Sequence, residues 1–70
     1  MQTLRRGQKW ILRLDTEEYS QVSHDEKSIS ALKTPKEIWY QVNNTWYVKW
    51  AFDIYFETKE DIIAWYMINT

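Results

Sequence analysis

The sequence predicts a single small α+β domain, an antiparallel sheet of three to four strands with a carboxy-terminal helix packed on one face. Three observations support this. Seventy residues are enough for one domain only. Two stretches alternate between apolar and polar positions with the period of a half-buried strand, and a helix-start signal follows the second. A 44% hydrophobic content with 17% aromatic residues supplies a core, so we expect a folded chain.

The first strand is expected at Gln8–Leu14. Trp10, Leu12 and Leu14 occupy every second position of this stretch, which is the pattern of a strand with one buried face. Gly7 comes directly before it and favours a turn at that point. The sequence therefore predicts that a strand follows a turn near the amino terminus.

Residues 15 to 36 show no clear periodicity. Two short pieces, Glu18–Val22 and Ser28–Leu32, are each compatible with a short strand or a helical turn. A structureless loop of this length is unusual in a small domain, so we expect part of the segment to be ordered. The sequence does not decide which part.

Residues 34 to 42 carry conflicting signals. The opening letters TPKE are placed like the N-cap, first position and capping-box residue of a helix. Glu37–Val42, however, is dense in β-branched and aromatic side chains. Asn43 and Asn44 follow, and asparagine tolerates the positive φ of a hairpin turn. We favour a strand, a turn and a second strand over Thr45–Phe56.

The length of the hairpin loop decides which side chains share a face, because a shift of one residue moves every side chain to the other face. A two-residue loop (NN) places Trp39 opposite Val48 and makes both faces apolar. A three-residue loop (NNT) places Tyr40 opposite Val48 and gathers the apolar residues on one face. Since the second arrangement separates core from surface, we prefer the three-residue loop.

The preferred register places Trp39 and Tyr47 together on the exposed face of the hairpin. Both loop lengths place Trp50 on the apolar face of the second strand, so we expect Trp50 in the core. That strand is long, so a bend or bulge is expected near Ala51–Asp53, with or without a division into two strands.

A final helix is expected at Lys59–Ile68. Thr58 and Asp61 are spaced as in a capping box, and acidic residues in the first turn suit the positive end of the helix dipole. A helix this short is stable only when it packs on another element, and the sheet is the available partner.

The residues that most enzymes and metal sites need are scarce. There is no cysteine, one histidine and one glycine, which leaves no disulfide, thiolate ligand or glycine-rich phosphate loop. His24 and Asp25 stand among serines, but no nucleophile elbow accompanies them, so we interpret the segment as a solvated polar loop. The neighbouring acids lack the spacing of a calcium loop. We expect no catalytic activity, cofactor or metal.

Charge is distributed in blocks, although the net charge is only -1. The first fourteen residues contain bases and no acid, namely Arg5, Arg6, Lys9 and Arg13. Residues 15 to 26 contain acids and no base, namely Asp15, Glu17, Glu18, Asp25 and Glu26. Such blocks either mark faces used in recognition or neutralise each other across the fold.

Two functions of different classes follow. The first is a protein-interaction module, an inhibitor or regulator of a larger protein, because Trp and Tyr are enriched at interface hot spots; homo-oligomerisation belongs to this class. Its expected contact residues are Trp39, Tyr47, Lys49 and Tyr55. In a variant of it, the acidic block imitates nucleic-acid phosphates. The alternative is single-stranded nucleic-acid binding, with bases stacked on sheet aromatics and the amino-terminal basic block on the backbone.

The sequence shows neither a membrane-spanning stretch nor the apolar segment of a signal peptide, so we expect a cytoplasmic protein that does not enter a membrane. Few Ala, Gly and Pro residues beside many Ile, Lys and Tyr residues fit an AT-rich coding sequence, and we expect an origin in a mobile genetic element.

Overall fold

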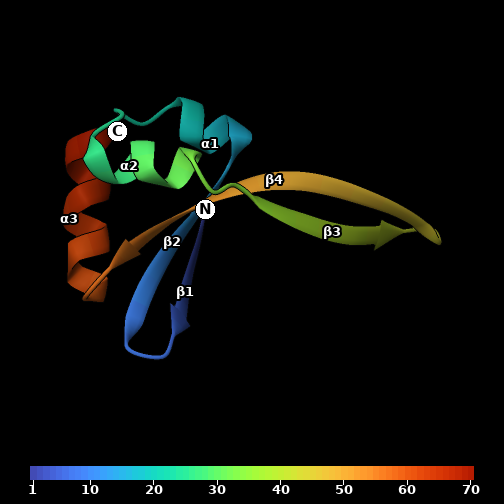
Figure 1. Cartoon of the computed structure of the whole chain (residues 1–70), viewed down its shortest axis with the longest axis horizontal. Helices are drawn as coiled ribbons and strands as arrows, with labels where there is room; N and C mark the ends of the chain where they lie inside the picture. Colours follow the sequence, from blue (N-terminus) through green and yellow to red (C-terminus); the bar gives the residue numbers. More distant parts are fainter.

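The computed structural model describes all 70 residues and confirms the α+β fold. Four antiparallel strands form one sheet in the order β1-β2-β4-β3, and three helices lie around one end of it (Figure 1). The elements are β1 (Gln2–Arg6), β2 (Lys9–Asp15), α1 (Thr16–Ser20), α2 (Glu26–Leu32), β3 (Lys36–Val42), β4 (Thr45–Phe56) and α3 (Lys59–Asn69).

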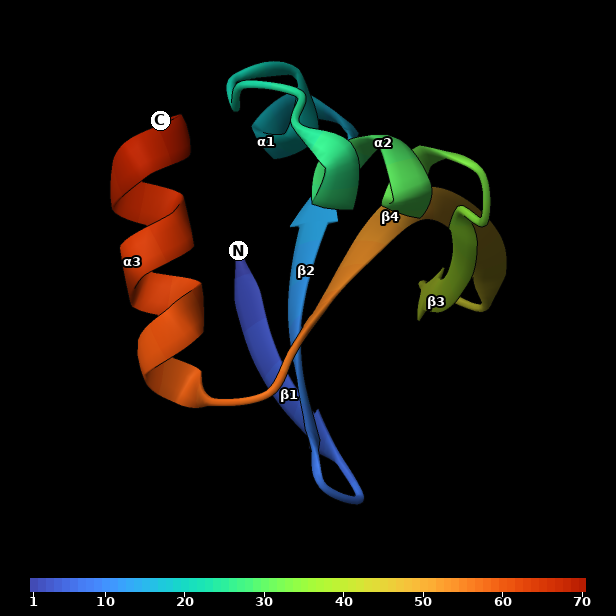
Figure 2. The ribbon, with the colours of Figure 1, turned by 60° about the vertical axis from the view of Figure 1, so that its left-hand side comes forward.

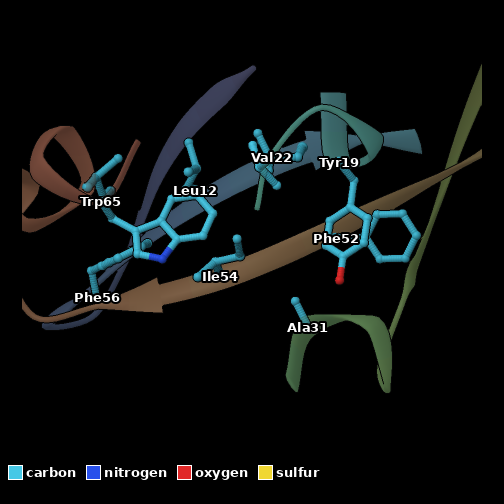
Figure 3. Close-up of a cluster of buried hydrophobic side chains, with 10 residues drawn as sticks. Leu12, Tyr19, Val22, Ala31, Phe52, Ile54, Phe56 and Trp65 are labelled. Carbon is cyan, nitrogen blue, oxygen red and sulfur yellow. The ribbon is translucent and has the colours of Figure 1, made fainter. Parts of the chain in front are cut away.

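The core lies on one face of the sheet, between β2, the second half of β4 and the helices (Figure 3). The cross-strand pairs Leu12 with Ile54 and Leu14 with Phe52 point to the same side and are buried there, because the helices cover them. The helices contribute aromatic and aliphatic partners to the same cluster. The residues of this cluster are Leu12, Leu14, Tyr19, Val22, Ala31, Phe52, Ile54, Phe56, Ile62 and Trp65. We call this side the helix face and the other side the open face. Ile11, Ala51 and Asp53 are also buried, on the open face of β2 and β4.

Two short helices occupy the segment that the sequence left undecided. Asp15 is the N-cap of α1, and its side chain accepts a hydrogen bond from the Glu18 amide while Glu18 accepts one from the Asp15 amide, which completes a capping box. Asp25 is the N-cap of α2 and accepts from the amide of Ser28 at 3.0 Å. Acidic residues therefore begin both helices.

Asp25 also joins α2 to α3. Its second carboxylate oxygen accepts a hydrogen bond of 2.7 Å from Nε1 of Trp65. Tyr19 donates its hydroxyl to the carbonyl of Ser28 at 2.6 Å, so α1 is tied to the same point. Ser28 is fully buried, and the prediction of a solvated loop is wrong here, because the local caps satisfy the polar groups inside the fold.

The predicted carboxy-terminal helix is confirmed and extends one residue further, to Asn69. Thr58 caps it by accepting from the Asp61 amide, as its spacing predicted. Ile62 and Trp65 are buried against the sheet.

The predicted hairpin is also confirmed, but the preferred loop length is wrong. Val42 pairs with Thr45 and Trp39 with Val48, which is the two-residue loop. Asn43 and Asn44 have φ values of 51° and 65°, both in the left-handed region, as a type I′ turn requires. The twist of this turn matches the twist of the flanking strands. The chain therefore adopts the two-residue loop, although a three-residue loop would separate apolar from polar side chains more cleanly.

β4 is the longest strand because it pairs with two partners in succession. Residues 51 to 56 pair with β2, and residues 45 to 51 pair with β3. The strand and its registers are uninterrupted, so neither a bulge nor a division into two strands occurs near Ala51–Asp53; Ala51 is where the partner changes, and it pairs with both Asp15 and Lys36.

This change of partner divides the sheet into a body and an arm. The body consists of β1, β2 and the second half of β4, with the helices beside it. We define the arm as the β3–β4 hairpin from Lys36 to Trp50, which projects beyond the helices (Figures 1 and 2). Trp50 lies in the arm and is 45% exposed, so its predicted place in the core is wrong. The apolar alternation of β4 continues past the point where the helices stop.

Candidate functional site

The arm carries most of the exposed aromatic surface of the protein. No residue from Leu32 to Trp50 is buried. Seven large hydrophobic side chains of the arm are 42 to 61% exposed: Trp39, Tyr40, Val42, Trp46, Tyr47, Val48 and Trp50. Exposed apolar side chains that are neighbours in one element form a patch, and patches of this kind mark interaction sites in folded proteins.

The helix face of the arm holds the tryptophans. Trp39 lies opposite Val48, and Trp46 and Trp50 flank Val48 on the same side of β4. The three indoles are 45 to 61% exposed. If a whole tryptophan side chain has an area of about 250 Å², their combined exposed area is roughly 400 Å². The single charge on this face is Glu37, which accepts a hydrogen bond of 3.1 Å from Nε1 of Trp39.

The open face of the arm holds the tyrosines. Tyr40 and Tyr47 are paired across the strands and their rings stack with centroids 5.7 Å apart. Nζ of Lys49 lies 5.9 Å from the centre of the Tyr40 ring, within the range of a cation–π contact. At the base of this face a hollow of about 220 Å³ is lined by Lys49 and Ile38 together with Glu18. The open face is thus amphipathic, whereas the helix face of the arm is apolar.

The structure brings three of the four predicted contact residues into the arm but separates them. Trp39 is on the helix face, and Tyr47 and Lys49 are on the open face, so the expected common face for Trp39 and Tyr47 is wrong. Tyr55 is 43% exposed on the open face of the body, where its carbonyl accepts from Nζ of Lys27. The two-residue turn explains the separation, because it shifts β3 by one position relative to the preferred register.

The sequence reasoning missed other residues of this surface. Trp46 is the most exposed tryptophan, at 61%, and Trp50 and Tyr40 also face solvent. The pair Asn43-Asn44 is the sequence feature from which these residues could have been predicted. It suits a type I′ turn, and the two-residue loop of that turn implies two apolar faces.

The amino-terminal bases lie at the β1–β2 hairpin, apart from the arm, and several have local partners. Arg13 donates from Nε and from a terminal nitrogen to the Asp53 carboxylate, both at 2.8 Å, and this bidentate pairing raises the pKa of Arg13. Lys9 forms an ion pair with Glu57. The guanidinium of Arg5 lies 5.5 Å from the Trp10 ring, and Arg6 is exposed in β1. The structure therefore does not place the basic block beside the arm's aromatic residues.

Most side chains of the acidic block form hydrogen bonds or ion pairs within the fold. Asp15 and Glu18 form the capping box of α1, Glu18 also pairs with the amino terminus, and Asp25 caps α2. Glu17 and Glu26 lie exposed in the first turns of the two helices. Capping accounts for most of the acids that the sequence suggested as a phosphate mimic.

His24 is a packing residue in this structure. Its ring stacks on Tyr19 with centroids 4.7 Å apart, and Nε2 lies 3.3 Å from the Tyr19 carbonyl. Burial raises the pKa of the Tyr19 phenol. Ser28 directs its hydroxyl to the carbonyls of Ser23 and Asp25. No group of three or more His, Asp or Glu side chains comes together as metal ligands.

Comparisons of the chain with protein-family models, with curated proteins and with solved structures give no match. None of the three helices has the length and apolar character needed to cross a bilayer.

Proposed function

We propose that this chain is a small protein-interaction module without catalytic activity, an inhibitor or regulator that binds a larger protein through the arm. One observation carries the proposal: seven large hydrophobic side chains are exposed on a hairpin that contributes nothing to the core. Trp and Tyr dominate this set, and these residue types are the commonest hot spots of protein interfaces. A stable interface buries about 800 Å² per partner, and the two faces of the arm together offer an area of that order.

Single-stranded nucleic acid is the alternative partner. The observation in its favour is the stacked pair of Tyr40 and Tyr47 beside Lys49, since stacked bases need an aromatic platform and a nearby cation. The charge of the arm argues against it. Lys36 and Lys49 are its only bases, and Glu37 lies among the tryptophans. A groove that follows a phosphate backbone needs a stronger positive potential, so we favour a protein partner.

A matched set of surface variants tests the proposal. The full chain is immobilised and used to capture proteins from a cell extract in parallel with Trp46→Ser and with Met67→Ser. Met67 is 75% exposed on α3 and serves as the control for loss of an apolar side chain outside the arm. The free energy of unfolding of both variants should lie within about 0.5 kcal/mol of that of the parent chain, since both positions face solvent.

We expect a protein that the parent chain and the Met67→Ser variant retain and that the Trp46→Ser variant loses. Retention by all three chains would overturn the arm as the site. Titration of the tryptophan fluorescence with single-stranded oligonucleotides decides the alternative, because saturable quenching that weakens with added salt would favour nucleic acid.

A further inference from the structure

The outer edge of β3 is open along its whole length. β3 contacts β4 and no other element, whereas β4 is also contacted by all three helices. The first half of β4 has a free edge as well, but that edge ends at Ala51, where β2 leads directly into α1. An added strand therefore meets no obstacle from another element beside β3.

The two edges of the sheet differ in where their charges lie. Edge strands are normally guarded by charges, proline or bulges, because unpaired amides and carbonyls attract further strands. β1, at the other edge, contains Arg5 and Arg6 among five residues. β3 has its two charges, Lys36 and Glu37, at its start, and from Ile38 to Val42 it contains no charge, proline or bulge. Such an edge suits pairing with another strand.

The hairpin register identifies which backbone groups are free. Residues next to a two-residue loop exchange both hydrogen bonds, and hydrogen-bonded and non-hydrogen-bonded pairs then alternate along the strands. Val42 and the residues at every second position before it direct their amides and carbonyls to β4. Glu37, Trp39 and Gln41 direct theirs outward. The three free positions are symmetric about Trp39.

We propose that β3 pairs antiparallel with β3 of a second copy of this chain, around a two-fold axis at Trp39. This register brings Trp39 opposite Trp39 and Glu37 opposite Gln41, and every free amide then meets a free carbonyl. No like charges oppose each other. On the open face, Ile38 lies opposite Tyr40, an apolar pair.

The pairing also removes a weakness of the arm. A two-stranded ribbon is marginal in water, and three or more strands are needed for independent stability. In the dimer the strands run in the order β4-β3-β3-β4 across the axis, so each arm is supported by its partner. The pairing uses the backbone edge of β3, so the inference goes beyond the proposed function. Trp46, Tyr47 and Trp50 lie on β4, away from the new contact, and stay accessible.

Charge variants at Gln41 test the register directly. Gln41→Glu places an acid opposite Glu37 of the second copy, and Gln41→Lys places a base there. Since each dimer contains this pair twice, we expect the two variants to differ in dimer dissociation constant on the order of tenfold, with Gln41→Lys tighter. The same two changes made together with Glu37→Gln should no longer differ. Sedimentation equilibrium over a range of concentrations measures these constants.

A backbone variant provides an independent test. Gln41→Pro removes an outward N–H, which an edge strand tolerates in the monomer but which the dimer requires. We expect this variant to sediment as an 8.7 kDa monomer where the parent chain is a dimer. Gln41→Thr is the control and should remain dimeric.

Three results would overturn the inference: a parent chain that is monomeric at all concentrations, a dimer that is insensitive to charge at Gln41, or an edge that pairs only with a foreign peptide. These results are separable from the proposed function, because a monomeric Gln41→Pro variant retains Trp46 and can still be tested for partner binding.

Discussion

Asp25 shows how much of this small fold depends on single polar side chains. Burial alone would raise the pKa of its carboxyl, but hydrogen bonds from the Ser28 amide, from Trp65 and from the Lys27 backbone outweigh it and hold the pKa below its ordinary value of 3.8. The carboxylate is thus the form that the folded state requires. A lowered pKa means that the stabilisation is present above pH 3.8 and is lost as the pH falls through the folded-state value.

Asp25→Asn should therefore destabilise the protein at neutral pH, and by less in acid. Asparagine keeps an oxygen for the Ser28 amide, but its amide nitrogen then faces Nε1 of Trp65, which is also a donor, so the charged hydrogen bond from Trp65 is lost. We expect a loss of about 1 kcal/mol in the free energy of unfolding at pH 7, and a difference from the parent chain that shrinks as the pH falls below 3.8. Urea unfolding between pH 7 and pH 3 measures this. Glu17→Gln, at an exposed acid, is the control.

The two helix caps also show what the sequence allows and what it does not. Asp15 and Glu18, spaced as D-x-x-E, form a capping box that the sequence contains and that the polar composition of the segment obscured. The partner of Asp25 could not be predicted in the same way, because Trp65 is forty positions away and the contact depends on how α3 packs. Local patterns predict where helices begin, whereas long-range polar contacts need the fold.

At the scale of elements, the β3–β4 hairpin was predictable in kind but not in register. The β-branched and aromatic density of the two stretches predicts strands, and the structure confirms them. The predicted register was wrong because it assumed that the whole hairpin has one buried apolar face and one exposed polar face. That rule holds for Phe52 and Ile54, which the helices cover, and fails for Trp46 and Trp50, which no helix reaches.

The turn itself gives a prediction at this scale. Asn44 has φ 65°, and glycine adopts that conformation without the steric cost of a side chain. Asn44→Gly should raise the free energy of unfolding by about 0.5 kcal/mol. Asn44→Val should lower it by about 1 to 2 kcal/mol, because a β-branched residue is strained at positive φ. Denaturant unfolding of the two variants under identical conditions measures both changes, and equal stabilities would contradict the type I′ turn.

At the scale of the whole molecule, the body and the arm differ in how they are stabilised. The buried cluster is confined to the body, where β2, β4 and the helices meet (Figure 3). The arm depends on its ladder of hydrogen bonds and on cross-strand pairs such as Tyr40 with Tyr47. Segments with few buried contacts open at lower free energy than the global unfolding free energy.

Native-state hydrogen exchange should resolve this difference in the monomeric Gln41→Pro variant. We expect the amides of β3 that face β4, such as Tyr40, to exchange through local opening, at lower protection than those of Leu12 and Ile54 in the body. In the parent chain at high concentration, the Trp39 amide should gain protection as the edges pair. Equal protection in arm and body of the monomer would show that the two unfold as one unit.

The unburied stretch from Leu32 to Trp50 has a consequence for how this protein can change over time. Substitutions there affect few core contacts, so most are expected to leave the fold intact. A surface whose side chains can be exchanged at small folding cost can acquire a new binding preference without rebuilding the domain. The helices and the body then act as a constant scaffold, and the hairpin is the part in which recognition can diversify.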